Sequence, residues 1–278
     1  MQRSVLLIAL SVSLSFGAGA QSIKTPPPST PQFVRQDFGL SNIELSYSRP
    51  GIKGRTIFGD LVPYDKVWRT GANNATTLTF GDDVIIGDTK VPAGKYGLLT
   101  IPGQNEWTFI ITRQLDVTNS AAYKQDQDVV RVKAQSHDMP FSLETFTILF
   151  SDVTSSSCNL TLCWDKTAVA IPIKTDIDSK VMKQIDNVMN KDGRPYFAAA
   201  LYYLDNGKDL NKAVEWFDKA IAQDPTAYYA VYQKARAQAK LGKKQDAIAT
   251  AKKSIELSKQ ANNPDYVALN EKLIASLQ

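Results

Sequence analysis

One stretch of the sequence, KVWRTGANNATTL at residues 66–78, places an aromatic ring, a guanidinium group and two amides side by side. Guanidinium groups bind carboxylates or phosphates through paired donors, and aromatic faces pack against sugars or cations. Side-chain amides supply the donors and acceptors that a hydroxyl-rich ligand needs. Five cations and two carboxylates fall between residues 47 and 74, so the segment is locally basic. We predict a site for an anionic or glycan ligand there. Its candidate residues are Tyr47, Arg49, Lys53, Arg55, Trp68, Arg69, Asn73 and Asn74.

The same residue types also suit a purely structural role. An arginine of this segment that paired with Asp60 or Asp65 would hold a loop over one end of a β domain. Trp68 would then fill the core below that loop. The sequence leaves both interpretations open.

Recognisable catalytic and metal-binding motifs are absent from the sequence. His137 is the only histidine, which excludes a histidine-rich metal cluster, and neither a GxSxG nor an HExxH string occurs. We therefore predict no catalytic residue, no metal ligand and no cofactor, and we expect a binding or scaffold protein that is not an enzyme. Scattered carboxylates leave one alternative, a periplasmic hydrolase acting on a glycan or a peptide.

An internal repeat marks the C-terminal part of the chain. The segments AVEWFDKAI (213–221) and AIATAKKSI (247–255) align at a separation of 34 residues, and a glycine precedes each of them, at Gly207 and Gly242. Thirty-four residues is the period of the tetratricopeptide helix pair. The first copy resembles the pattern of that family at Phe197, Ala200, Leu201, Leu204, Ala213, Phe217, Ala220 and Pro225.

The second copy is a weaker match. Ala247 and Ala251 fit the pattern, whereas Ser254 and Lys259 depart from it. A closing helix is expected at residues 264–277, and a generic helical bundle is the alternative. The tetratricopeptide resemblance implies that a protein or peptide partner binds along the first helix of each repeat. By position, the protein-binding residues would be Tyr202, Tyr229, Tyr232 and Arg236.

The first half of the chain has the two-residue period of β-strands. Apolar side chains alternate with threonines in EWTFIIT (106–112) and ETFTILF (144–150). Gly87-Asp88 separates the short segments VII and TKV, as a two-residue hairpin turn does. About nine short strands fit between residues 32 and 174, a density that predicts an antiparallel β-sandwich or jelly-roll-like domain.

The N-terminus has the features of a secretory signal peptide. Arg3 precedes the apolar core VLLIALSVSL (5–14), and the small residues of Ala18-Gly19-Ala20 suit a cleavage site. We expect residues 1–20 to be removed, which leaves a periplasmic or secreted protein without a membrane span. Residues 21–31 then form a proline-rich linker. The net charge of +4 is too small for a nucleic-acid-binding protein, and no basic run is interleaved with aromatic residues.

Residues 32–174 resemble a family of exported bacterial proteins known as domain of unknown function 2911. The resemblance rests on YSRPGIKGRTIFGDLVPYDKVWRTGANNATTLTF (47–80), on VPAGKYGLLTIPGQNEWTFII (91–111), and on the later strings ETFTILFSDV and LTLCWDKTAVAIPI. It implies export and a β fold, and it assigns no activity. The expected architecture is a β-sandwich at 32–174 followed by a tetratricopeptide-like helical domain at 176–278.

Overall fold

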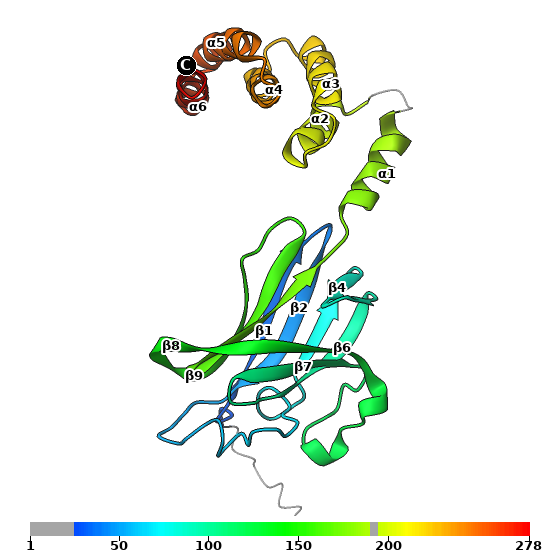
Figure 1. Ribbon diagram of the computed structural model, residues 1–278, viewed down its shortest axis with the longest axis vertical. Coiled ribbons are helices and arrows are strands. Elements are labelled where there is room, and N and C mark those ends of the chain that lie inside the picture. The colour runs from blue at the N-terminus through cyan, green and yellow to red at the C-terminus, as the bar shows by residue number, and fades with distance from the viewer. Residues whose placement is uncertain (1–24, 190–193) are drawn as a thin grey trace, which may run out of the picture. The chain divides into compact units, whose positions relative to one another are not determined.

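The computed structural model of the chain describes residues 25–189 and 194–278 (Figure 1). The chain divides into two compact units, and the boundary along the sequence lies between Thr175 and Asp176. The signal peptide predicted at residues 1–20 lies outside the described residues. None of the helices in the described ranges is long and apolar enough to cross a lipid bilayer.

Within the described residues, the first unit, here the β unit, contains nine strands joined in antiparallel pairs, in the order β1-β2-β3-β6-β7-β8-β9-β4-β5. The strands are β1 (Thr30–Phe38), β2 (Ser41–Arg49), β3 (Thr77–Phe80), β4 (Val84–Ile86), β5 (Thr89–Val91), β6 (Gly94–Ile101), β7 (Glu106–Thr112), β8 (Asp128–Ser151) and β9 (Ser157–Lys174). The antiparallel β architecture predicted from the sequence is confirmed. The first strand begins at Thr30, inside the range 21–31 that the sequence assigns to a linker.

Two of these strands are much longer than the alternation in the sequence suggests. Strand β8 has 24 residues and β9 has 18. Strand β8 pairs with β7 as far as Gln135 and with β9 from Ser136 onward, and its register shifts after Asp138 and again after Leu143. Strand β8 therefore connects the part of the sheet that contains β7 with the part that contains β9, as Figure 1 shows. The sheet folds over a shared apolar core, to which β2 contributes Ile43.

The hairpin turns follow from local residue chemistry. Gly87 joins β4 to β5 with a φ of 60°, and Gly39 joins β1 to β2 with a φ of 61°. Side chains with a Cβ rarely adopt this left-handed conformation, whereas glycine adopts it freely. The two-residue turn predicted at Gly87-Asp88 is therefore confirmed.

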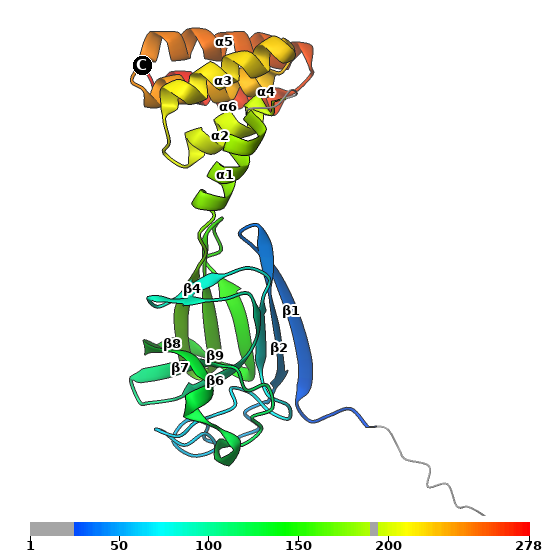
Figure 2. The same cartoon turned by 90° about the vertical axis from the view of Figure 1, so that its right-hand side faces the viewer.

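The second unit, here the helical unit, contains six helices in the described residues, and the stack from α2 onward is clearest in Figure 2. Gly207 follows the end of α2 and Gly242 follows the end of α4, where the repeat pattern predicts turns. Their φ values of 64° and 75° are left-handed, as is usual for a glycine just after a helix. The helices are α1 (Asp178–Met189), α2 (Tyr196–Asp205), α3 (Leu210–Gln223), α4 (Tyr228–Lys240), α5 (Lys244–Gln260) and α6 (Pro264–Ala275).

Small residues let the paired helices approach closely. Ala213 packs inside the first pair, and Ala247 and Ala251 are fully buried in the second. Ser254, where the second copy departs from the family pattern, is also fully buried, and its hydroxyl donates to the carbonyl of Tyr228 at 2.9 Å. The serine therefore replaces an apolar contact between helices with a hydrogen bond.

Candidate functional site

The basic segment predicted as a ligand site forms the end of β2 and the long loop between β2 and β3. Tyr47 is buried on β2, and its hydroxyl accepts a hydrogen bond from the Ile148 N–H at 3.0 Å and donates to Gln32 Oε1 at 2.7 Å. Arg49 donates to the carbonyl of Phe146 at 3.0 Å and to the Thr147 hydroxyl at 2.7 Å. Both side chains thus join β2 to β8.

Trp68 belongs to a cluster of aromatic rings. Its indole stacks on Trp164 with ring centroids 5.9 Å apart, and it packs edge-on against Phe146 at 5.0 Å and Trp107 at 6.3 Å. Phe58, from the same loop, packs on Trp107 at 4.9 Å. The loop therefore contributes two rings to the aromatic core of the β unit, and the half-buried Trp68 packs mostly against protein.

The remaining polar residues of the loop donate to main-chain carbonyls. Arg55 donates to Ile52 and to Gly51 of its own turn, at 3.0 and 2.7 Å. Arg69 donates to the carbonyl of Thr118, and Asn73 donates to the carbonyl of Ser29 at 2.9 Å. Lys53 and Asn74 are exposed to solvent.

The ion pairs expected in the structural interpretation are absent: in the described part of the chain, no arginine of this segment pairs with Asp60 or Asp65. The loop also contains several residues with a left-handed backbone. Thr70 is the strained one, because a β-branched residue at a φ of 57° is unusual. Its buried hydroxyl lies 3.0 Å from that of Thr100. Most donors of this segment are used inside the protein, and ligand binding by these residues stays a prediction.

A row of aromatic rings lies on α2, α4 and α6, which are the first helices of successive repeats. Phe197 of α2 lies 5.1 Å from Tyr229, which lies 5.7 Å from its neighbour Tyr228 on α4. Tyr228 lies 5.0 Å from Tyr266 of α6, which in turn lies 5.5 Å from Tyr232. Every contact is edge-to-face, a favourable geometry for aromatic pairs. We call the surface formed by the four tyrosines the tyrosine face.

The tyrosine face is open to solvent and carries polar groups. Tyr229 is 37% exposed, and the other three rings are half-buried. Tyr228 accepts a hydrogen bond from Asn263 at 3.0 Å, whereas the other three hydroxyls make no hydrogen bond within the described residues. Burial raises the pKa of Tyr266, with smaller effects from the neighbouring tyrosines, and Arg236 acts to lower it. Arg236 follows Tyr232 by four residues on α4, so the two side chains lie on the same side of the helix.

The four residues predicted to bind a protein partner do not all lie on this face. Tyr229 and Tyr232 belong to it, and Arg236 lies beside it, paired with Asp205 at 3.3 Å. Tyr202 instead donates to Asp178 of α1 at 2.9 Å. Its pKa is raised to about 12, first by burial and then by the Asp178 carboxylate.

Sequence reasoning missed Tyr228 and Tyr266. Tyr266 could have been found, because it follows Tyr232 by one repeat of 34 residues. The period was applied to the two complete repeats and not to the closing helix. Tyr228 directly precedes Tyr229. Whether its ring lies on the tyrosine face depends on how α4 is rotated about its axis, which the repeat pattern does not specify.

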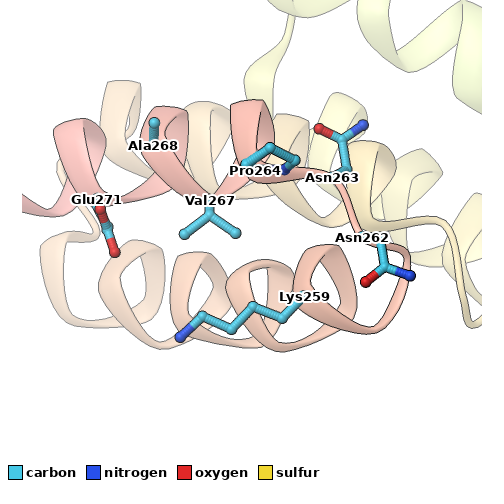
Figure 3. A pocket seen from close by; sticks show the side chains of 7 residues that line it. All are labelled: Lys259, Asn262, Asn263, Pro264, Val267, Ala268 and Glu271. Carbon is cyan, nitrogen blue, oxygen red and sulfur yellow. The ribbon is translucent and has the colours of Figure 1, made fainter.

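Several hollows border the helices of the second repeat. A cavity of about 300 Å³ opens beside Tyr228 and Tyr229, and Leu257 contributes apolar surface to it. A groove of about 410 Å³ lies between α5 and α6, where Val267 points into the space and Lys259 extends along α5 (Figure 3). The first hollow adjoins the tyrosine face, so a side chain bound there would also contact the rings.

No group of carboxylates, cysteines or histidine suited to a metal ion occurs in the ranges that the structure describes. Asp128 has a buried carboxylate, and burial raises its pKa. It accepts a hydrogen bond from Tyr123 at 2.5 Å and lies 3.5 Å from Arg131. Cys158 and Cys163 on β9 are both buried free thiols, and burial raises their pKa values.

Comparison with known proteins agrees with this division into two units. The tetratricopeptide repeat model matches residues 193–226 and 228–260, which span α2 to α5. No curated protein and no solved structure matches the chain. A second family model covers residues 29–173, more than half of the chain and nearly all of the β unit. The chain therefore belongs to the family described as "Protein of unknown function (DUF2911)".

Proposed function

We propose that this protein is an exported scaffold, without enzymatic activity of its own, whose tyrosine face binds an extended segment of a protein partner. Tetratricopeptide repeats indicate protein–protein interaction, and such arrays present elongated surfaces. The observation that carries the proposal is the row of aromatic rings across α2, α4 and α6, with Tyr229 37% exposed. Tyrosine is enriched at interfaces because its ring is apolar and its tip is polar.

Comparative capture from the envelope fraction of the producing cell tests this proposal. We expect partners retained by the wild type to be lost from Tyr229→Ala and Tyr232→Ala, because each change removes a ring from the face. Arg236→Ala tests the polar edge of the face. Lys252→Ala, at an exposed position on α5, serves as the control for Arg236→Ala and should retain every partner. If all variants capture the same partners as the wild type, the tyrosine face is not the binding surface.

Export is the second part of the proposal, and it rests on residues 3–20 of the sequence alone. Mass spectrometry of the protein from its native host should give a chain that begins near Gln21. A chain that retains Met1 in an envelope or secreted fraction would contradict signal-peptide cleavage.

An anionic or glycan ligand of the β unit stays a prediction. It is supported only by the basic composition of residues 47–74, because most of the arginine donors there are used by main-chain carbonyls. A thermal-shift screen against glycans, peptidoglycan fragments and acidic peptides tests it, since any ligand that binds only the folded state raises the melting temperature. The same screen addresses the hydrolase alternative, if product formation is measured for each compound.

A further inference from the structure

We propose that the tyrosine face binds a proline-rich segment in the polyproline II conformation, and that its occupant is the segment Thr25–Pro28, which precedes β1, of a second copy of this chain. The inference rests on the proposed function, because it assigns a class of partner to the same face. Its first support is the chemistry of the face, its second is the charge there, and its third is how the segment is presented.

The chemistry of the face matches what a polyproline helix offers. Such a helix has no internal hydrogen bonds, so its carbonyl groups are available as acceptors, and its proline rings pack well on aromatic surfaces. The face has four rings in continuous edge-to-face contact. Within the described residues, the hydroxyls of Tyr229, Tyr232 and Tyr266 are available to donate. The face therefore offers aromatic rings and hydroxyl donors together, and aromatic-lined grooves are the surfaces that recognise proline-rich peptides.

Charge favours a neutral occupant. Arg236, the cation beside the face, pairs with Asp205 at 3.3 Å. An acidic peptide that bound the guanidinium would have to displace this partner. The segment TPPP at residues 25–28 carries no charged side chain, so it can bind without breaking the pair.

The segment is exposed and is held at its base. Pro26, Pro27 and Pro28 are exposed, and β1 begins at Thr30. The carbonyl of Ser29 accepts a hydrogen bond from Asn73 at 2.9 Å, which fixes the segment where it meets the β unit. Consecutive prolines already favour the extended conformation, so little conformational entropy is lost when they bind. The short contact predicts a weak and reversible interaction at the low end of interface sizes.

Fluorescence anisotropy with a labelled peptide of residues 22–32 tests the contact directly. We expect the anisotropy to rise when the wild-type protein, residues 21–278, is added. Tyr229→Ala and Tyr232→Ala should each weaken binding at least tenfold, and Lys252→Ala should leave it unchanged. A peptide with Pro26→Ala, Pro27→Ala and Pro28→Ala should not bind. Circular dichroism of each protein variant checks that a loss of binding is not a loss of fold.

Sedimentation velocity over a range of protein concentrations tests the occupant. The wild type should associate as concentration rises, and the chain with Pro26→Ala, Pro27→Ala and Pro28→Ala should remain monomeric. A wild type that stays monomeric at every concentration and ignores the peptide overturns the inference. If such a protein still captures a partner through Tyr229, the proposed function stands and only this occupant fails. Peptide binding that survives both tyrosine substitutions also overturns the inference, because the contact then lies elsewhere.

Discussion

At the scale of single residues, Tyr47 shows how a candidate ligand contact can be a structural one. Its hydroxyl meets the main chain of Ile148 on β8 and also the Gln32 side chain on β1. Burial raises the pKa of this phenol, so it stays protonated and can keep donating. One polar atom therefore satisfies groups on two strands that are distant in sequence.

Tyr47→Phe should lower the free energy of unfolding of the β unit by about 1–3 kcal/mol. The substitution leaves the Ile148 N–H buried without its acceptor, while the ring and its contact with Phe146 remain. Urea denaturation followed by tryptophan fluorescence measures the change. Tyr64→Phe is the matched control, because Tyr64 lies half-exposed in the loop after β2. Equal stability of the two variants would contradict a structural role for the Tyr47 hydroxyl.

A second residue-scale prediction concerns Asp128, whose pKa is raised by burial. The folded protein then holds this proton more tightly than the unfolded chain, so the stabilisation is full at low pH and is lost as pH rises through the folded pKa. Asp128→Asn removes the titrating group. We expect the stability advantage of the variant over the wild type to grow as the pH rises from below about 4 towards neutrality. Urea unfolding at a series of pH values measures the difference.

Asp37→Asn provides the comparison for Asp128→Asn, since Asp37 is an exposed carboxylate on β1. If the Asp128→Asn difference depends on pH in the same way as the Asp37→Asn difference, the buried carboxylate does not have the raised pKa described above.

The residue scale is also where prediction from the sequence was least complete. The basic segment was found, but the partners of its arginines were not, because they are main-chain carbonyls and such acceptors exist at every residue. Sequence patterns indicate charged pairs far better than contacts to the backbone. Tyr228 and Tyr202 show a related limit, since small rotations of a helix decide which face each ring joins.

At the scale of elements, the two repeats begin their second helices differently. Asp209 caps α3 by accepting hydrogen bonds from the N–H groups of Asn211 and Lys212, at 2.9 and 3.2 Å. The corresponding residue before α5 is Lys243, whose side chain makes no capping bond. A cation at this end also opposes the helix dipole.

Lys243→Asp should therefore stabilise the helical unit by about 0.5–1 kcal/mol, because it supplies a capping acceptor and removes an unfavourable charge. Helical circular dichroism during thermal unfolding measures the effect. Lys243→Ala separates the two causes, since it removes the charge without adding a cap and should give a smaller gain. A melting temperature for Lys243→Asp at or below the wild-type value would contradict the capping argument.

Short elements were easier to predict than long ones. Gly87 and the repeat glycines mark turns through their backbone freedom, and the structure has turns at these positions. The length of β8 was missed, because the bulges that continue the strand interrupt the alternation of buried and exposed side chains between Asp138 and Thr147. Read as separate runs, these segments resemble several short strands.

At the scale of the whole molecule, each unit has a hydrophobic core of its own. The core of the β unit includes Trp107 and Trp164, and that of the helical unit includes Trp216 and Phe217. We expect residues 176–278, produced alone, to fold into a helical domain with a cooperative thermal transition. Circular dichroism of this fragment measures the outcome, with residues 21–175 as the companion fragment. A disordered spectrum for residues 176–278 would show that its core is insufficient.

The contact between Tyr47 and Ile148 spans 101 residues of sequence, and it has a consequence for the order of folding. Most contacts in the helical unit join helices that are neighbours along the chain, whereas β2 meets β8 only after most of the β unit has been made. Long-range pairing of this kind slows folding. In a refolding experiment, the helical signal should recover well before the tryptophan signal of the β unit. During synthesis, Ile43 and Leu45 of β2 would stay exposed to solvent until the later strands that complete the core are made. Chaperones act on such exposed apolar strands.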